Sequence, residues 1–445
     1  MKYEPVIGLE IHVELATKSK MFCSCSAEYF GEKPNTHTCP VCLGLPGAMP
    51  TANKKAIKYA QMLGMALHCE NPLSSKFDRK NYFYPDLAKG FQISQYDLPF
   101  SENGSVTIKI DDETEKIGIT RAHMEEDTGK LAHAIINGRR VTLIDFNRSG
   151  VPLVEIVSEP QMHSAEEAKA YAQKIQQVVR FLEISEADME KGSMRIEPNI
   201  SLRLLSKTRL KNDNLPSYKV ELKNINSFRF AQKAINYEIE RQSKILDDGK
   251  IPIQETRGWD EVHNKTVSQR SKEKAQEYRY FPEPDLTPYE FKEDYMAELK
   301  AKLPELPDVK FDRFKNQYLL SDYDSEILTR DRQTADYFEE AANVGRKHNL
   351  TPKQIANVII NKKPDTNKIL PAELIQTLVA SLNTVTTDEQ QLDKVVSEVI
   401  KQNPKAVEDY KKGKENAIMF LTGQVMRRIK ADSNEVQEKL KERLK

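Results

Sequence analysis

The larger, N-terminal part of the chain shows the alternation of apolar and polar side chains that is typical of β-strands. In residues 6–15 every second side chain is apolar, which places Glu10 and His12 together on the opposite face. Residues 194–203 and 219–223 repeat this alternation. Strands with one apolar and one polar face are typical of an antiparallel sheet that covers a core with one side only.

Two helices interrupt these strands, and both carry residues that begin or end a helix. Ser164 and Glu167 form a capping box, and the apolar stripe after them predicts a helix over residues 164–182. A second helix, predicted over residues 228–248, ends at Gly249, because glycine readily adopts the left-handed conformation that closes a helix. The pattern therefore predicts an α+β fold with a mostly antiparallel sheet.

Beyond residues 281–288 every strong pattern is helical. This segment contains three prolines and predicts a stiff connector. Thr351 and Pro352 mark a helix start, apolar stripes at helical spacing follow, and Ser433 caps a last helix. We therefore predict three regions, which are an α+β domain over residues 1–290, a helical domain over 291–385 and a helical tail over 386–445.

The composition is that of a folded chain with a heavily charged surface. Of the 445 residues, 39% are hydrophobic and 30% are charged. Lys+Arg and Asp+Glu each number 67, and this balance excludes a uniformly basic nucleic-acid-binding protein. No apolar run approaches the roughly 18–20 residues of a membrane-spanning helix, and acidic residues stand where a signal peptide would be apolar. We expect a cytoplasmic protein with no membrane partner.

The charge balance breaks in the tail. Residues 401–445 contain twelve Lys or Arg and seven Asp or Glu, a net charge of +5. Such a bias is common on an ordinary solvated helical surface. It also suits a module that contacts the phosphates of a nucleic acid.

Four of the five cysteines are grouped, at Cys23 and Cys25 and then at Cys39 and Cys42. The pair Cys39-Pro-Val-Cys42 suits a tight turn that directs both thiolates at one ion, and zinc takes four such ligands. Buried or redox-active thiols remain the alternative. Cys69 stands alone and is interpreted as a small core residue.

Acidic and imidazole side chains recur at two-residue spacing. Glu10 and His12 leave the same face of one predicted strand, and His123, Glu125 and Asp127 repeat the spacing. Carboxylate and imidazole ligands suit Mg²⁺ or Mn²⁺ better than a soft metal. Solvated residues on the polar face of a sheet would show the same pattern.

Basic side chains accompany these acidic ones in residues 77–86 and 143–155, as a phosphoryl-transfer pocket requires. The chain has no P-loop or dinucleotide-binding glycine motif and no recognisable nucleophile motif. We therefore expect no covalent acyl-enzyme. The residues predicted to bind the phosphate-bearing cofactor of such a pocket are Arg79, Lys80, Arg148, Glu155, Arg195 and Lys223.

Several long motifs resemble the GatB family, the B subunits of the glutamyl/aspartyl-tRNA amidotransferases, and the resemblance spans nearly the whole chain. The matching segments are residues 6–15, 76–86, 123–127, 145–160, 220–228, 254–257, 278–285 and 413–426. One departure is the Ile-Glu of Met-Arg-Ile-Glu-Pro-Asn at 194–199, where Cys-Asp is expected in many bacterial members. Because of that difference, the resemblance does not assign roles to the individual residues of this strand.

The resemblance implies an ATP-dependent ligase with glutamine as the amido-nitrogen donor. A GatB protein phosphorylates the side-chain carboxylate of misacylated Glu-tRNA(Gln) or Asp-tRNA(Asn), and ammonia then displaces the phosphate. The ammonia comes through a channel from the amidase (glutaminase) subunit, and the complex is braced by a small third subunit. The implied fold is a cradle domain with a kinase-like site and a zinc-binding insert, then a helical domain, then a helical tail that contacts the tRNA.

The resemblance also assigns the metal ligands. Mg²⁺ would be held by Glu10, His12 and Glu125, which are the predicted catalytic residues, and zinc by Cys23, Cys25, Cys39 and Cys42. The competing hypothesis is a non-catalytic, zinc-containing tRNA-binding scaffold. Three hard ligands that converge on one polar face favour the catalytic alternative, because a scaffold has no use for them.

Overall fold

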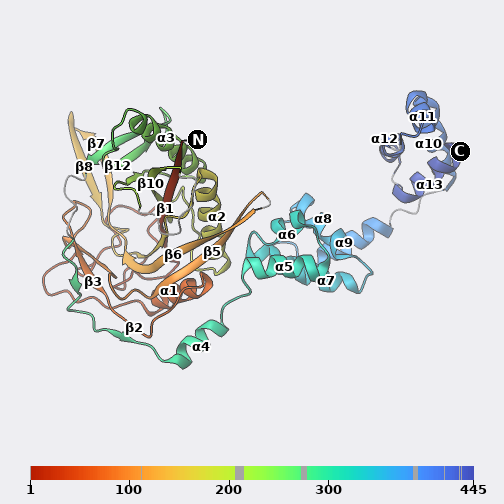
Figure 1. The fold of residues 1–445 in the computed structure, drawn as a ribbon. Coiled ribbons are helices and arrows are strands. Elements are labelled where there is room, and N and C mark those ends of the chain that lie inside the picture. The colour runs from red at the N-terminus through yellow and green to blue at the C-terminus, as the bar shows by residue number, and fades with distance from the viewer. Residues whose placement is uncertain are drawn as a thin grey trace. The chain divides into compact units, whose positions relative to one another are not determined.

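Figure 1 shows the computed structural model of the chain. It describes residues 2–111, 113–205, 215–271, 278–383, 389–414, 416–429, 431 and 433–444. The chain divides into two compact units, Met1–Lys310 and Phe311–Lys445. Among the described residues, no helix is both long enough and apolar enough to span a lipid bilayer.

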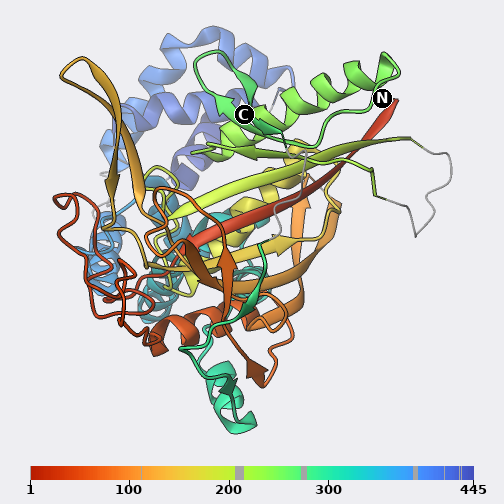
Figure 2. The same ribbon diagram turned by 90° about the vertical axis from the view of Figure 1, so that its left-hand side faces the viewer.

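An eight-stranded sheet organises the first unit, with β1 near its centre (Figure 2). Neighbouring strands are antiparallel except for the parallel pair β11–β12. In spatial order the strands are β13 (Lys265–Ser271), β12 (Glu255–Asp260), β11 (Val220–Lys223), β10 (Met194–Leu204), β1 (Tyr3–Glu14), β9 (Pro152–Ser158), β6 (Glu113–Glu126) and β5 (Ser101–Ile110). The predicted strands at 6–15, 194–203 and 219–223 are therefore confirmed, and so is the α+β class.

Three helices pack against this sheet: α1 (Lys54–Ala66), α2 (Ala165–Phe181) and α3 (Phe228–Asp247). Their apolar stripes join the alternate apolar side chains of the central strands in one core that includes Ile7, Ile11 and Tyr171. The serine caps of α2 and α3 confirm the two helices predicted from the sequence. Helix α1 was not predicted, although Asn53 caps it by accepting two backbone hydrogen bonds.

Three small sheets complete the first unit. They are β14 (Phe281–Pro282) with β3 (Asp78–Asn81) and β4 (Phe91–Ser94), β15 (Tyr289–Glu290) with β2 (Ser74–Ser75), and β7 (Lys130–Ile136) with β8 (Arg139–Asp145). Residues 281–288, predicted as a connector, are instead attached to the first unit. β14 pairs with β3, and the buried Glu283 carboxylate accepts a 2.7 Å hydrogen bond from Arg79. The prolines stiffen a segment that lies on the domain.

The elements described after Glu290 are helices, as the sequence predicts. They are α4 (Glu293–Ala301), α5 (Pro307–Tyr318), α6 (Asp322–Leu328), α7 (Arg332–Arg346), α8 (Pro352–Lys362), α9 (Pro371–Asn383), α10 (Glu389–Gln402), α11 (Pro404–Lys411), α12 (Asn416–Met426) and α13 (Ser433–Leu444). The apolar stripes of α10, α12 and α13 meet in a core of their own. The division into three regions with boundaries at 290 and 385 stays a prediction, and part of its second boundary lies outside the described residues.

Candidate functional site

One row of side chains crosses four neighbouring strands on the polar face of the large sheet. His12 on β1 is paired in register with Arg195 on β10 and, on its other side, with Glu155 on β9. Glu155 is in turn paired with His123 on β6. Directly paired residues of an antiparallel sheet project from the same face. The pairing register therefore assembles this row from residues far apart in the sequence.

A second pair lies beside the row. Glu10 is opposite Glu197 in the β1–β10 register, and its carboxylate accepts a 2.9 Å hydrogen bond from the Asn199 amide. Lys223 lies 2.8 Å from Glu197 and 3.2 Å from Glu221. The side chains of β10 and β11 thus extend the polar site away from β9.

Glu125, at the end of β6, is almost completely buried. Its carboxylate accepts hydrogen bonds from Ser94 (3.0 Å), Gln92 (3.1 Å) and Lys80 (3.3 Å), which come from β3 and β4. Burial would raise the pKa of Glu125, but the Lys80 ammonium and the His123 imidazole hold it well below its usual range. The same ion pair keeps the pKa of Lys80 well above its usual range despite burial. Glu125 is therefore an ionised carboxylate inside the protein.

Two groups of hard ligands meet at His12. Glu10, His12 and Glu197 form one group, and His12, Glu125 and Glu155 form the other, with the ligand atoms of each group within 4.8 Å of one another. The predicted set of Glu10, His12 and Glu125 is thus divided between two groups that share the imidazole. Carboxylate oxygens with one imidazole are ligands that Mg²⁺ or Mn²⁺ accepts.

The electrostatics of this cluster fit a bound cation. Burial, together with the charges of Glu155 and Glu197, raises the pKa of Glu10. Two buried polar atoms, Nδ1 of His12 and Oδ1 of Asn199, have no hydrogen-bond partner among the residues that the structure describes. A divalent cation would relieve the repulsion between the carboxylates, so the donor set fits a metal ion.

The four grouped cysteines converge, as their spacing predicts. The sulfur atoms of Cys23, Cys25, Cys39 and Cys42 all lie within 4.8 Å of one another, and the cysteines are free thiols. The 3.8 Å between the sulfurs of Cys39 and Cys42 matches the edge of a tetrahedron with metal–sulfur bonds of about 2.3 Å. This cluster can therefore hold a metal ion.

A completely buried lysine lies against the cysteine cluster. The Lys20 ammonium donates hydrogen bonds to the carbonyls of His37 (2.7 Å) and Phe146 (3.3 Å) and lies 3.7 Å from the Cys42 sulfur. A hydrogen bond from the Cys23 thiol and the charge of Lys20 lower the pKa of Cys42 to about 4. Cys42 therefore favours the thiolate, which is the form that binds metal, whereas burial raises the pKa of Cys25 to about 11.

Two of the predicted cofactor-binding arginines meet at Asp127. Arg195 lies 2.8 Å from this carboxylate and Arg148 lies 3.6 Å from it. Although burial opposes the effect, the two guanidinium charges keep the pKa of Asp127 below its usual range. Burial and the nearby Asp127 raise the pKa of Glu14 to about 8. Arg148 also donates to the backbone carbonyls of residues 128 and 129.

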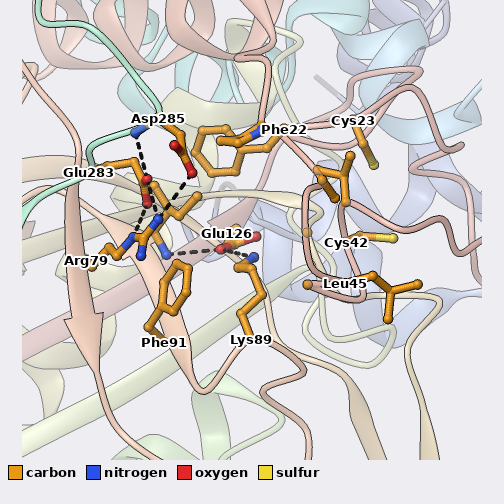
Figure 3. Close-up of a pocket in the computed structure, with 16 residues that line it drawn as sticks. Phe22, Cys23, Cys42, Leu45, Arg79, Lys89, Phe91, Glu126, Glu283 and Asp285 are labelled. Carbon is orange, nitrogen blue, oxygen red and sulfur yellow. Dashed lines mark hydrogen bonds and ion pairs between the residues drawn. The ribbon is translucent and has the colours of Figure 1, made fainter.

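Arg79 lies apart from the row, in a separate pocket of about 180 Å³ (Figure 3). Its guanidinium is paired with Glu283 at 2.7 Å and with Asp285 at 3.3 Å. Lys89, 2.5 Å from Glu126, lies in the same pocket, whose opposite wall includes Cys23 and Cys42. A role for Arg79 in cofactor binding stays a prediction, as do those of the other residues named from the sequence.

Sequence reasoning did not single out Glu197, Asn199, Gln92 or Ser94 as site residues. The alternation of residues 194–203 correctly places Glu197 and Asn199 on the polar face. The pairing of Glu197 with Glu10 depends on the register between strands that are far apart in the sequence, and no local pattern encodes that register.

Known proteins match the chain over nearly its whole length. The GatB/GatE catalytic domain family model matches residues 5–297, and the GatB domain model matches residues 331–444. A relative from Caldanaerobacter subterraneus subsp. tengcongensis is 45% identical over 98% of this chain and 97% of its own. A relative from Carboxydothermus hydrogenoformans is 45% identical over 97% of this chain and 96% of its own.

Both relatives are named as the B subunit of an aspartyl/glutamyl-tRNA(Asn/Gln) amidotransferase, and so is one from Brevibacillus brevis that is 43% identical over 97% of this chain. These matches include the row of polar side chains and the cysteine cluster within the catalytic-domain range. The chain therefore belongs to the GatB family of aspartyl/glutamyl-tRNA(Asn/Gln) amidotransferase subunits.

Proposed function

We propose that the chain is the subunit that activates and amidates the misacylated tRNA. It transfers the γ-phosphoryl group of ATP to the side-chain carboxylate of Glu-tRNA(Gln) or Asp-tRNA(Asn). Ammonia from a glutaminase (amidase) subunit then gives Gln-tRNA(Gln) or Asn-tRNA(Asn), and the complex is completed by a small third subunit. We expect a cytoplasmic location, because the substrate is an aminoacylated tRNA that is used in translation.

The chemistry explains why ATP is needed. A carboxylate does not react with ammonia at neutral pH, because its leaving group would be an oxide. In the first step a carboxylate oxygen bonds to the γ-phosphorus while the bond to ADP breaks. In the second step ammonia attacks the carbonyl carbon of the acyl phosphate, inorganic phosphate leaves, and the nitrogen loses a proton.

The row on the polar face is the observation that carries this proposal. His12 with Glu125 and Glu155, and Glu10 with Glu197, are the residues that would hold Mg²⁺ against the nucleotide phosphates. When bound, Mg²⁺ offsets the negative charge of the phosphoryl group in transfer. Lys80, Arg195 and Lys223 surround these carboxylates with fixed cations, so the site has groups for both metal and phosphate.

The cysteine cluster would hold zinc in a structural role. Four thiolates fill a tetrahedral site and leave no position for a water or a substrate. The cluster belongs to a segment of little regular structure, residues 15–53. A metal crosslink would stabilise this segment, because its backbone makes few regular hydrogen bonds.

The test is an amidation assay with the chain in complex with its partner subunits. ATP, glutamine and either Glu-tRNA(Gln) or Asp-tRNA(Asn) are supplied, and ADP and the amidated aminoacyl group are measured. We expect ADP release that depends on the misacylated tRNA. A complex that binds tRNA but leaves ATP intact would instead support the scaffold alternative.

A further inference from the structure

A two-stranded ribbon, made of β7 and β8, projects from the first unit (Figures 1 and 2). The two strands pair with each other from Lys130–Asp145 at the root to Ile136–Arg139 at the tip. Side chains on both faces are largely exposed, so neither face covers a core. An isolated ribbon of this kind is marginally stable in water, which suggests a role other than packing.

The root of the ribbon is fixed beside the candidate active site. Arg148 holds the carbonyls of Thr128 and Gly129, and Asn35 donates its backbone N–H to the Asp145 carboxylate at 2.9 Å. The ribbon begins four residues after Glu126, where β6 ends. With seven residues in each strand, the tip stands roughly 20 Å from the root.

The ribbon is basic although the whole chain has no net charge. It carries Lys130, Arg139 and Arg140, and residues 128–144 contain no carboxylate. All three side chains are exposed, and within the described part of the chain no carboxylate is paired with them. Cations that lack internal partners and stand in solvent are available to an anionic ligand.

The tip presents the same chemistry on both faces. Ile135 is paired in register with Arg140 on one face, and Ile136 with Arg139 on the other. The ribbon contains no Phe, Tyr or Trp, so it has neither a platform for stacking on bases nor the aromatic anchors that are enriched in protein interfaces. Exposed guanidinium groups beside aliphatic side chains suit phosphates and the adjoining riboses of a helical RNA.

We propose that the β7–β8 ribbon contacts the sugar–phosphate backbone of the tRNA acceptor arm. This inference rests on the proposed function, because the carboxylate to be amidated is carried at the 3′ end of that arm. When this end occupies the polar row, the adjoining acceptor helix must lie close outside it. The ribbon is fixed at that place and supplies cations for the phosphates.

A second ribbon in the same unit provides a matched control. The outer ends of β5 and β6 also project (Figure 1), but that end is acidic, with carboxylates at residues 111, 113 and 115. Lys109 and Lys116 are exposed cations near that end. Replacing these two lysines with alanine changes the net charge by the same amount as replacing Arg139 and Arg140. The lysines, however, lie in an acidic region, whereas the arginines lie in a basic one.

The experiment compares Arg139→Ala/Arg140→Ala with Lys109→Ala/Lys116→Ala in the assembled complex. Binding of Glu-tRNA(Gln) is measured across a salt titration, together with the oligomeric state. We expect the arginine variant to bind on the order of tenfold more weakly. The salt slope, which is the slope of the logarithm of the binding constant against the logarithm of the salt concentration, should decrease in magnitude by about one unit per lost phosphate contact. The lysine variant should match the wild type.

Equal binding and equal salt slopes for the arginine variant and the wild type would overturn the proposal. Loss of a partner subunit from the arginine variant would also overturn it, because the ribbon would then be a protein-docking element. The proposed function is tested separately. In the wild-type complex, ADP release that depends on misacylated tRNA supports that function whatever the ribbon variants do. Its absence would refute the function and not the ribbon's affinity for RNA.

Discussion

His12 on β1 and Glu155 on β9 are directly opposed in the antiparallel register. This pairing fixes the imidazole and the carboxylate on one face, at a spacing set by the sheet and not by flexible loops. His12 also belongs to both groups of hard ligands, with Glu125 and Glu155 on one side and Glu10 and Glu197 on the other. We infer that His12 is the centre of the candidate active site.

The helical tail is expected to bind tRNA independently of the polar row. A chain that ends at residue 383 keeps the entire core of the first unit, since α10, α12 and α13 form a separate apolar core. We expect the truncated chain to remain folded and to bind ATP, but to bind tRNA more weakly and with a flatter salt dependence.

A full-length variant serves as the control for this truncation. Lys401→Gln/Lys405→Gln/Lys411→Gln removes three exposed cations of the tail without removing a helix. It should lower the salt slope in the same direction as the truncation. If both chains bind tRNA as tightly as the wild type over the titration, the +5 charge of the tail is an ordinary solvated surface.

The cysteine cluster is expected to bind one zinc ion with a structural role. Metal analysis of the wild-type chain should give about one zinc per chain. Cys39→Ser should lose the metal and lower the midpoint of thermal unfolding by several degrees, because metal binding contributes to the free energy of folding. Cys69→Ser, outside the cluster, should keep the zinc. A disulfide within the cluster, or a metal-free wild type, would contradict this assignment.

The sequence predicts three strands and two helices of the first unit because each has a local signal, such as the alternation in residues 6–15 or the serine at the start of α2. It also predicts that the four cysteines meet, since ligand spacing is a local property. Pairing register is not local. The position of Glu197 opposite Glu10, and the attachment of residues 281–288 to β3, therefore required the three-dimensional structure.

The second unit contains a carboxylate whose ionisation should stabilise the fold. Asp324 on α6 is buried, is paired with Lys353 and accepts a 2.7 Å hydrogen bond from Ser321. Burial opposes ionisation, but these two partners lower the pKa of Asp324 below its usual value. Such a group contributes stability above its unfolded pKa of about 3.9, and that contribution is lost as the pH falls through the folded pKa.

Asp324→Asn should therefore lower the free energy of unfolding by about 1 kcal/mol at neutral pH. The difference from the wild type should shrink as the pH falls below about 4. Glu326→Gln on the same helix, where the carboxylate is exposed, should have little effect at any pH. The free energies of unfolding of all three chains are measured with urea at several pH values. If the difference between Asp324→Asn and the wild type is constant with pH, that result would argue against the ion pair.

The most direct test of the central claim is the release of ADP by the Glu125→Gln variant in the assembled complex, with misacylated tRNA and ATP. Glu125 is a buried, ionised carboxylate that would ligate the cation in the row, and its amide replacement keeps the shape without the charge. We predict that ADP release and amidation fall by at least about a hundredfold, while the glutaminase of the partner and tRNA binding persist. ADP release at the wild-type rate would contradict the assignment of phosphoryl transfer to this row.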